Sequence, residues 1–199
     1  MDTHPIHLVV DDDLRRSRLT VFFRGLLVIP HLLFLLLWAI AAYVLWIVNW
    51  FATLVMGRSP DGLHSFLARF VRYMGRVQAY YHLLANPFPP FGSGGSYAVD
   101  VEIAPPEQQN RLTVFFRGLL GIPAMILNYF LNAVFNIVAI FAWFACLVLG
   151  RMPEGLRNFG VFVLKYQMQT IGYLMLLTPR YPSLNVGQSE TETSPAATV

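Results

Sequence analysis

The chain has few of the residues on which most enzymes and secreted domains rely: one cysteine, one lysine and few charges among 199 residues. Its single cysteine, Cys146, excludes an intramolecular disulfide. No His or Cys pair has the spacing of a metal site, and neither a Gly-x-Ser-x-Gly motif nor a phosphate-binding glycine loop is present. We therefore expect no catalytic residues, no metal site and no cofactor, and predict that the protein is not an enzyme.

Charge is also missing from two long stretches. Charged residues make up 13% of the chain, against roughly a quarter in ordinary soluble domains. None occurs between Leu26 and Met56, and only Arg117 lies between Val114 and Leu149. Because about 20 apolar residues suffice to cross a bilayer, we expect transmembrane helices at residues 31–56 and 124–149. The N-terminus lacks the basic start of a secretion signal, so we expect the first apolar stretch to be retained as an anchor.

What charge there is gives a net +3, carried by thirteen arginines and one lysine. No basic run is typical of a nucleic-acid interface. In a chain this apolar, the basic excess favours anionic lipid headgroups as partners. The expected partners are therefore membrane lipids together with other membrane subunits or further copies of the chain, and no nucleic acid.

The chain repeats itself 93 positions later. Arg18–Pro30 returns as Arg111–Pro123 with one difference in thirteen positions, and Gly57–Leu63 returns as Gly150–Leu156 in similar form. Such a duplication defines the unit of architecture. We predict an all-α membrane protein of two tandem repeats, residues 1–90 and 91–183, followed by a disordered polar tail at 184–199.

Each repeat is predicted to contain four elements. Alternating residues at 6–10 and 99–103 indicate short strands outside the membrane, which would pair with each other. Next comes an interfacial helix that ends at Pro30 or Pro123; alternatively, this segment is a kinked first turn of the spanning helix. A second inserted or amphipathic helix, at about 62–85 and 155–177, completes each repeat.

A turn joins the two helices of each repeat. A glycine that can take the left-handed conformation, an arginine at the helix end, a proline and an acid at the start of the next helix are typical of a helical hairpin. The turn residues are Gly57, Arg58, Pro60, Asp61, Gly150, Arg151, Pro153 and Glu154. A ligand site at this motif is the alternative.

Cations on the shorter helices are the candidate contacts for lipid headgroups. Arg69, Arg72 and Arg76 share one face of the second helix, and Lys165 alone remains of this stripe in the second copy. Long basic side chains can reach the headgroup level, which also makes Arg24 and Arg117 candidates. We expect inserted second helices with these cations turned toward headgroups or a polar crevice; a pair of interfacial helices is the alternative.

Three amides lie four residues apart along the second long helix: Asn128, Asn132 and Asn136. Because amides in hydrocarbon need hydrogen-bond partners, we interpret them as a packing seam between repeats or protomers. A polar stripe that lines a path or holds a lipid or quinone is the alternative.

The repeated pattern resembles the domain-of-unknown-function family 4389. The resemblance rests on the short strand, Arg-Leu-x-x-x-x-Arg-x-Leu-Leu-x-Ile-Pro, the long apolar helix and Gly-Arg-x-Pro-x-Gly-Leu-x-x-Phe, from about Ile6 to Pro182. It implies an integral membrane protein, largely bacterial, without established activity and without catalytic residues to transfer.

Together these features predict a non-enzymatic scaffold or accessory subunit of a membrane complex. A lipid- or small-molecule-binding or transport protein that uses the basic stripe is the alternative. With an even number of crossings, both repeats would share one orientation, and the arginines near their starts would place both termini in the cytoplasm of a bacterial plasma membrane.

Overall fold

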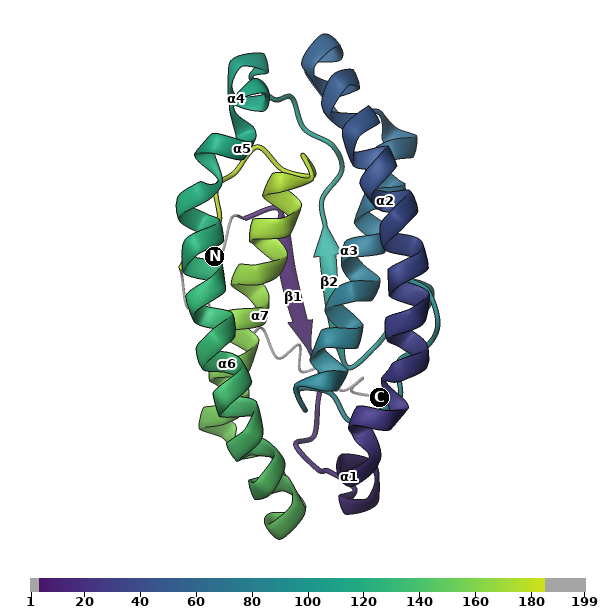
Figure 1. Cartoon of the computed structure of the whole chain (residues 1–199), viewed down its shortest axis with the longest axis vertical. Coiled ribbons are helices and arrows are strands. Elements are labelled where there is room, and N and C mark those ends of the chain that lie inside the picture. The colour runs from purple at the N-terminus through teal and green to yellow at the C-terminus, as the bar shows by residue number, and fades with distance from the viewer. Residues whose placement is uncertain (1–3, 185–199) are drawn as a thin grey trace, which may run out of the picture.

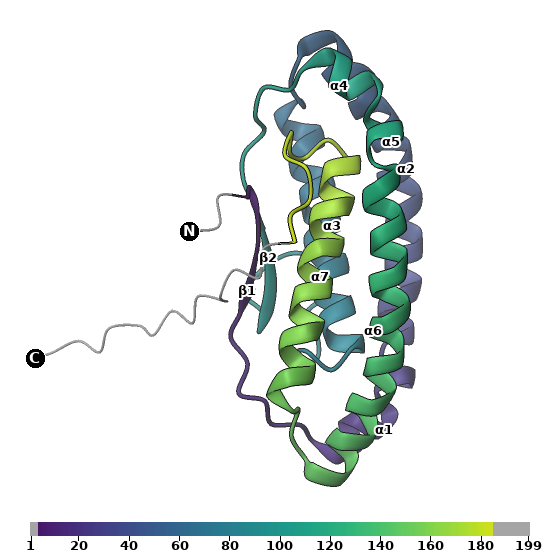
Figure 2. The same ribbon diagram turned by 90° about the vertical axis from the view of Figure 1, so that its left-hand side faces the viewer.

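The computed structural model describes residues 4–184, and its elements form three layers (Figures 1 and 2). The long helices α2 and α6 form one outer layer, α3 and α7 the middle layer, and a two-stranded sheet covers the opposite face (Figure 2). In chain order the elements are β1 (Ile6–Val10), α1 (Arg18–Leu27), α2 (Ile29–Met56), α3 (Asp61–Tyr81), β2 (Val99–Ile103), α4 (Arg111–Phe115), α5 (Arg117–Leu120), α6 (Ile122–Leu149) and α7 (Glu154–Leu174).

The sheet is made by one strand from each repeat, as the duplication predicted. β1 and β2 pair antiparallel, with Ile6 opposite Ile103 and Val10 opposite Val99. The central pair joins Leu8 to Val101, which are equivalent positions of the two copies. A pseudo-two-fold axis therefore passes through the middle of the sheet.

This axis runs across the long helices, so the expectation that both repeats share one orientation is wrong. α2 and α6 run in opposite directions (Figure 1), and the end of each lies against the start of the other repeat, with α2 contacting α4 and α6 contacting α1. The physical reason is the path of β2, which takes the chain back along the molecule before α6 begins. The second repeat therefore starts at the opposite end.

The inverted arrangement also divides the arginines differently from the prediction. The arginines that precede α2 and the arginines that precede α6 lie at opposite ends of the molecule. Arg15 instead forms a backbone bridge with Arg151, and Arg58 forms one with Gln108. Basic residues therefore lie at both ends of the long helices, and the positive-inside argument for cytoplasmic termini loses its basis.

The predicted interfacial helix continues into the long helix with only a bend. α1 gives way to α2 at Val28, whose backbone remains right-handed helical and whose carbonyl accepts from Leu32. Pro30 lies within the first turn of α2 and does not end a helix. The second copy has two such irregularities, at Phe116 and Gly121. The alternative of a bent start to the long helix describes this segment better.

A narrow seam connects each long helix to the rest of the molecule. Buried positions recur at alternating three- and four-residue steps, while the positions between them are exposed. This spacing places the buried residues on one stripe of the helix. In the first repeat the stripe includes Val21, Arg24, Val28, His31, Ala42, Asn49 and Thr53.

The middle layer contains the core, where glycines permit close approach. A Cβ on Gly75 of α3 would lie 2.5 Å from Cγ2 of Val101 in β2, and one on Gly172 of α7 would overlap Cδ1 of Ile6 in β1. Both middle helices therefore pack directly against the sheet. Residues 185–199, nearly all of the predicted polar tail, lie outside the described residues.

Candidate functional site

The most extensive surface feature is the apolar outer face of α2 and α6. Two helical stretches, Arg18–Met56 and Ile122–Leu149, are long and apolar enough to cross a membrane, with mean hydropathies of 2.3 and 2.2 over their most apolar windows. Only 11% and 17% of those windows are buried within the molecule. Leu37 is 69% exposed, and its counterpart Phe130 is 61% exposed. An exposed apolar surface of this extent marks an interaction site.

Arg24 and Arg117 do not reach outward to headgroups but turn inward. Arg24 donates from Nη1 to the carbonyl oxygens of Tyr80 and Ala85, at 2.8 and 3.0 Å, and its guanidinium lies 4.3 Å from the Tyr80 ring centroid. Both arginines are 2% exposed. Each serves its own repeat by binding the carbonyls at the end of the second helix.

The second copy reproduces this arrangement with one addition. Arg117 donates to the carbonyl of Thr178 at 3.3 Å and lies 4.2 Å from the ring centroid of Tyr173. It also donates to the side-chain oxygen of Gln109. The repeated arginine is therefore a structural clamp between the first and second helices of each repeat.

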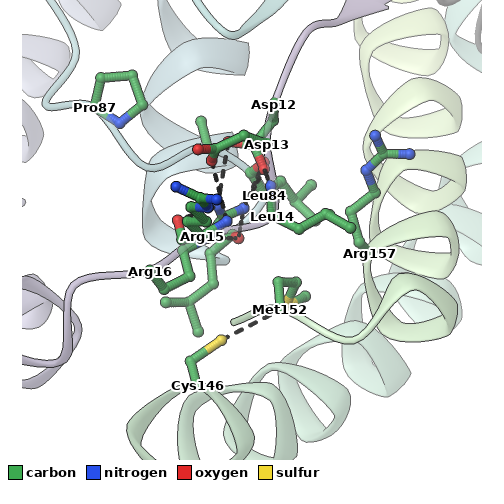
Figure 3. A network of polar contacts seen from close by, with 12 residues as sticks. Asp12, Asp13, Leu14, Arg15, Arg16, Leu84, Pro87, Cys146, Met152 and Arg157 are labelled. Carbon is green, nitrogen blue, oxygen red and sulfur yellow. Dashed lines mark hydrogen bonds and ion pairs between the residues drawn. The ribbon is translucent and has the colours of Figure 1, made fainter. Parts of the chain in front are cut away.

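A second buried group secures the chain just after each middle helix. Arg16 donates from Nε to the carbonyl of Leu83 at 3.0 Å and pairs with Asp12 at 2.5 Å, and both charged side chains are almost fully buried (Figure 3). Its counterpart Gln109 donates to the carbonyl of Leu176 at 2.7 Å. Leu83 and Leu176 both have a left-handed backbone, with φ of 65°. The side chains of Arg16 and Gln109 therefore stabilise two equivalent turns.

The basic stripe on α3 faces strand β2. Arg76 is fully buried and donates to both carboxylate oxygens of Asp100, at 3.0 and 2.9 Å. Arg72 also donates to Asp100, from Nε and Nη2, whereas Arg69 is exposed and donates to the carbonyl of Ser65 in its own helix. Of the three arginines, Arg69 alone is free to meet a headgroup outside the molecule.

The carboxylate of Asp100 is strongly stabilised by its partners. Burial alone would raise its pKa, but hydrogen bonds from Arg72 and Arg76 and their positive charges outweigh burial and lower the pKa below 3.8. Asp100 therefore remains ionised at neutral pH. The cluster is an internal ion network that joins the middle layer to the sheet.

The second copy has other residue types at the positions of this network. Lys165 is half-buried at the place of Arg72, while Gln169 replaces Arg76 and His7 replaces Asp100. Gln169 donates to the carbonyl of Ile6 at 3.3 Å and accepts from the backbone of Ser183 at 3.0 Å. At the place of Arg76, neutral hydrogen bonds of Gln169 therefore replace the ion pair.

The turn residues lie where the two helices of each repeat meet. Gly57 and Gly150 have left-handed backbones, with φ of 76° and 68°, and end the long helices. Pro60 and Pro153 immediately precede the middle helices, whose first residues are Asp61 and Glu154. The exposed Arg58 pairs loosely with Asp61 at 3.4 Å. This geometry is that of a helical hairpin.

The three asparagines form a ladder along α6. Asn132 donates to the carbonyl of Asn128 at 2.9 Å, and Asn136 donates to that of Asn132 at 2.8 Å. Next to Asn136, the ring of Phe135 stacks on the ring of His82 from the first repeat, with centroids 4.1 Å apart. The end of the ladder therefore contacts the other repeat, while the rest satisfies its own helix.

A shallow cleft of about 600 Å³ lies between α3 and the end of β2. Its lining mixes charges of both signs, including Asp61, His64, Arg69, Arg72 and Glu102. Within residues 4–184, no group of three or more His, Cys, Asp or Glu side chains could hold a metal ion.

The buried Arg16 and Asp100 were not singled out as structural ions from the sequence. The only available signal was position: Arg16 and Gln109 occupy equivalent places, as do Asp100 and His7, but their residue types differ. The structural role of these positions becomes visible only when their partners are known. Arg16 binds the turn at Leu83, and Asp100 binds Arg76 on α3.

Comparison with known proteins gives one family. No curated protein and no solved structure matches the chain. The family model described as domain of unknown function (DUF4389) matches residues 18–93 and again residues 111–184. The two matches correspond to the two structural repeats, with a strand before each. The chain therefore belongs to the DUF4389 family and carries two tandem copies of its domain.

Proposed function

We propose that the protein is a non-enzymatic membrane protein whose α2 and α6 contact acyl chains while the opposite layer presents a scaffold surface to other membrane subunits. The observation that carries this proposal is that exposed apolar side chains are concentrated on one face of the molecule, the outer layer. Leu37 and Phe130 are highly exposed on the outer layer, whereas the arginines that sequence suggested for ligands, Arg24, Arg76 and Arg117, bind groups of the protein itself.

Apolar area of this extent is unfavourable in water at about 25 cal/mol per Å². Acyl chains relieve that cost without a specific partner. The internal use of the buried cations also supports a scaffold over the alternative of lipid or small-molecule handling, because of the five arginines proposed for headgroups it leaves only Arg69 exposed, beside the shallow cleft.

Membrane association is tested by sedimentation of membranes without detergent, followed by an alkaline carbonate wash. The unmodified protein should stay in the pellet. Leu37→Glu and Phe130→Glu, which place a carboxylate at equivalent exposed positions, should move protein to the supernatant. Val9→Glu is the matched control, since the second copy already has Glu102 at the equivalent place on the sheet. Unmodified protein that remains in the supernatant as a single species would contradict the proposal.

The scaffold role is tested by purification in mild detergent. We expect other membrane subunits to co-purify in defined ratio. Protein that elutes alone but retains anionic lipid, and loses that lipid in Arg69→Ala, would instead support the lipid-binding alternative.

A further inference from the structure

We infer that the molecule lies flat in a single leaflet, with α2 and α6 parallel to the membrane plane, the outer layer among acyl chains and the sheet in water. The inference rests on the proposed membrane association and adds to it an orientation and a lipid surface. It differs from a crossing arrangement, in which the same helices would stand upright.

The layers are stacked at the middle of the long helices. Trp38, near the middle of the helical stretch Arg18–Met56, contacts Phe70 and Tyr73 of α3, at ring centroid separations of 5.9 and 5.5 Å. Two residues after Tyr73, Gly75 lies so close to the centre of the sheet that an added Cβ would be 2.5 Å from Cγ2 of Val101. The sheet therefore lies at mid-length of the long helices and to one side of them (Figures 1 and 2).

Upright helices would hold this sheet at the depth of the hydrocarbon centre. The exposed Glu102 and Arg69, and the partly exposed Arg72, would then be at hydrocarbon depth. A charged side chain is strongly disfavoured at that depth, because it loses its hydration. In the flat orientation the same side chains remain in water.

The strand edges give a second, independent reason. In the described residues β1 pairs only with β2, so each strand has one edge without a strand partner. Open sheet edges that face lipid do not occur, because the hydrocarbon offers no hydrogen-bond partner to the free backbone N–H and C=O groups. Water satisfies both edges when the sheet faces away from the bilayer.

The depth of the apolar layer fits one leaflet. A helix with its side chains is about 10–12 Å thick, and helices that lie in the interface bury their apolar face by about 5–10 Å. α2 and α6 are attached to α3 and α7 through a narrow seam, so most of their circumference is free to contact lipid. No part of α3, α7 or the sheet needs to enter hydrocarbon.

Charge at the ends of the outer layer favours lipid over a second copy of the chain. Arg18 and Arg111 are exposed at the starts of α1 and α4, at opposite ends of the apolar face, close to Gly150 and Gly57 respectively. Lying flat, both meet the phosphates of the same leaflet. Two copies stacked by this face would instead bring such arginines toward one another.

The test counts labels on single molecules. Gly62 and Gly155 are equivalent, exposed positions at opposite ends of the molecule, and a Cβ at either meets nothing within 4 Å. The double variant Gly62→Cys/Gly155→Cys is built on Cys146→Ala and reconstituted in sealed vesicles of phosphatidylcholine and phosphatidylglycerol. A membrane-impermeant maleimide is added outside, and labels are counted by intact mass.

In the flat orientation each molecule carries two labels or none, whichever way it faces. In a crossing orientation each molecule carries one label, which would overturn the inference and leave the proposed membrane association intact. Val9→Cys, on the sheet, should be labelled to the same fraction as the end positions; full protection of this position would also count against the flat orientation.

Leu37→Cys and Phe130→Cys report on the lipid face itself. Both should be protected in vesicles and react once the vesicles are dissolved in detergent. If both react in sealed vesicles as fast as Val9→Cys, the membrane proposal fails as well. If both are protected in detergent-free buffer, with the protein sedimenting as a dimer, a second copy covers the face and the inference is wrong.

Discussion

Gly75 and Met168 occupy equivalent positions in the two copies, and they meet at the pseudo-two-fold axis: a Cβ on Gly75 would lie 3.2 Å from Sδ of Met168. The absence of a side chain on α3 leaves the space that the long side chain of α7 occupies. The two copies have therefore become complementary at the place where a symmetric pair would oppose like residues.

The first prediction concerns this contact. Gly75→Ala should destabilise the protein by about 1–3 kcal/mol, because its Cβ would overlap Val101 and crowd Met168. Thermal unfolding in mild detergent should show a fall in Tm of several degrees. The exposed Gly62→Ala, which meets nothing within 4 Å, should leave Tm unchanged or slightly higher. Equal losses in both variants would contradict the packing argument.

The second prediction concerns the ion network. Asp100→Asn should cost about 3–5 kcal/mol, because it leaves the fully buried Arg76 without its counter-charge. The double variant Arg76→Met/Asp100→Asn should recover part of that loss. Unfolding free energies of the two single variants and the double variant measure the coupling; additive losses would show that the pair does not act as a unit.

The third prediction is a pH dependence with a defined sign. The folded pKa of Asp100 lies below the unfolded value of 3.8, since the arginine contacts outweigh burial. Its contribution to stability is therefore complete above about pH 4 and is lost as pH falls through the folded pKa. Below pH 4 the unmodified protein should lose Tm more steeply than Asp100→Asn. Parallel curves would show that this carboxylate does not carry the acid sensitivity.

The fourth prediction concerns the repeated clamp. Arg24→Met should remove hydrogen bonds to the carbonyls of Tyr80 and Ala85, each worth about 1.5–3 kcal/mol for a charged donor. Arg24→Lys should restore only part of the loss, because an ammonium lacks the planar fork. Limited proteolysis after α3 should accelerate in the methionine variant; an unchanged cleavage rate would mean that the clamp does not hold this segment.

The fifth prediction concerns the joints between repeats. Trp143 donates from Nε1 to the carbonyl of Val21 at 3.0 Å, and Trp50 donates to that of Val114 at the same distance. Replacing either with Phe should cost about 1 kcal/mol. Because the joints lie at opposite ends of the molecule, the two losses should add in the double variant. A strongly non-additive result would indicate that the repeats separate as one step.

The sequence predicted the features that local chemistry determines. Strand pairing followed from the duplication, and the helix ends from glycines such as Gly57. The direction of the second repeat was predicted wrongly, because it depends on the path of β2, which periodicity does not reveal. Arg76 was predicted to face headgroups or a polar crevice, because its actual partner Asp100 lies 24 residues away on another element.

The five-residue strand of each repeat has its only strand partner, within the described residues, in the other repeat. A single copy produced alone would have an unpaired strand, and pairing with the strand of a second copy would favour a dimer. Two identical halves would then oppose Gly75 to Gly75, leaving a hollow, or Met168 to Met168, with no room for both. Because both repeats belong to one polypeptide, their sequences can diverge into complementary halves, and each half always has its partner.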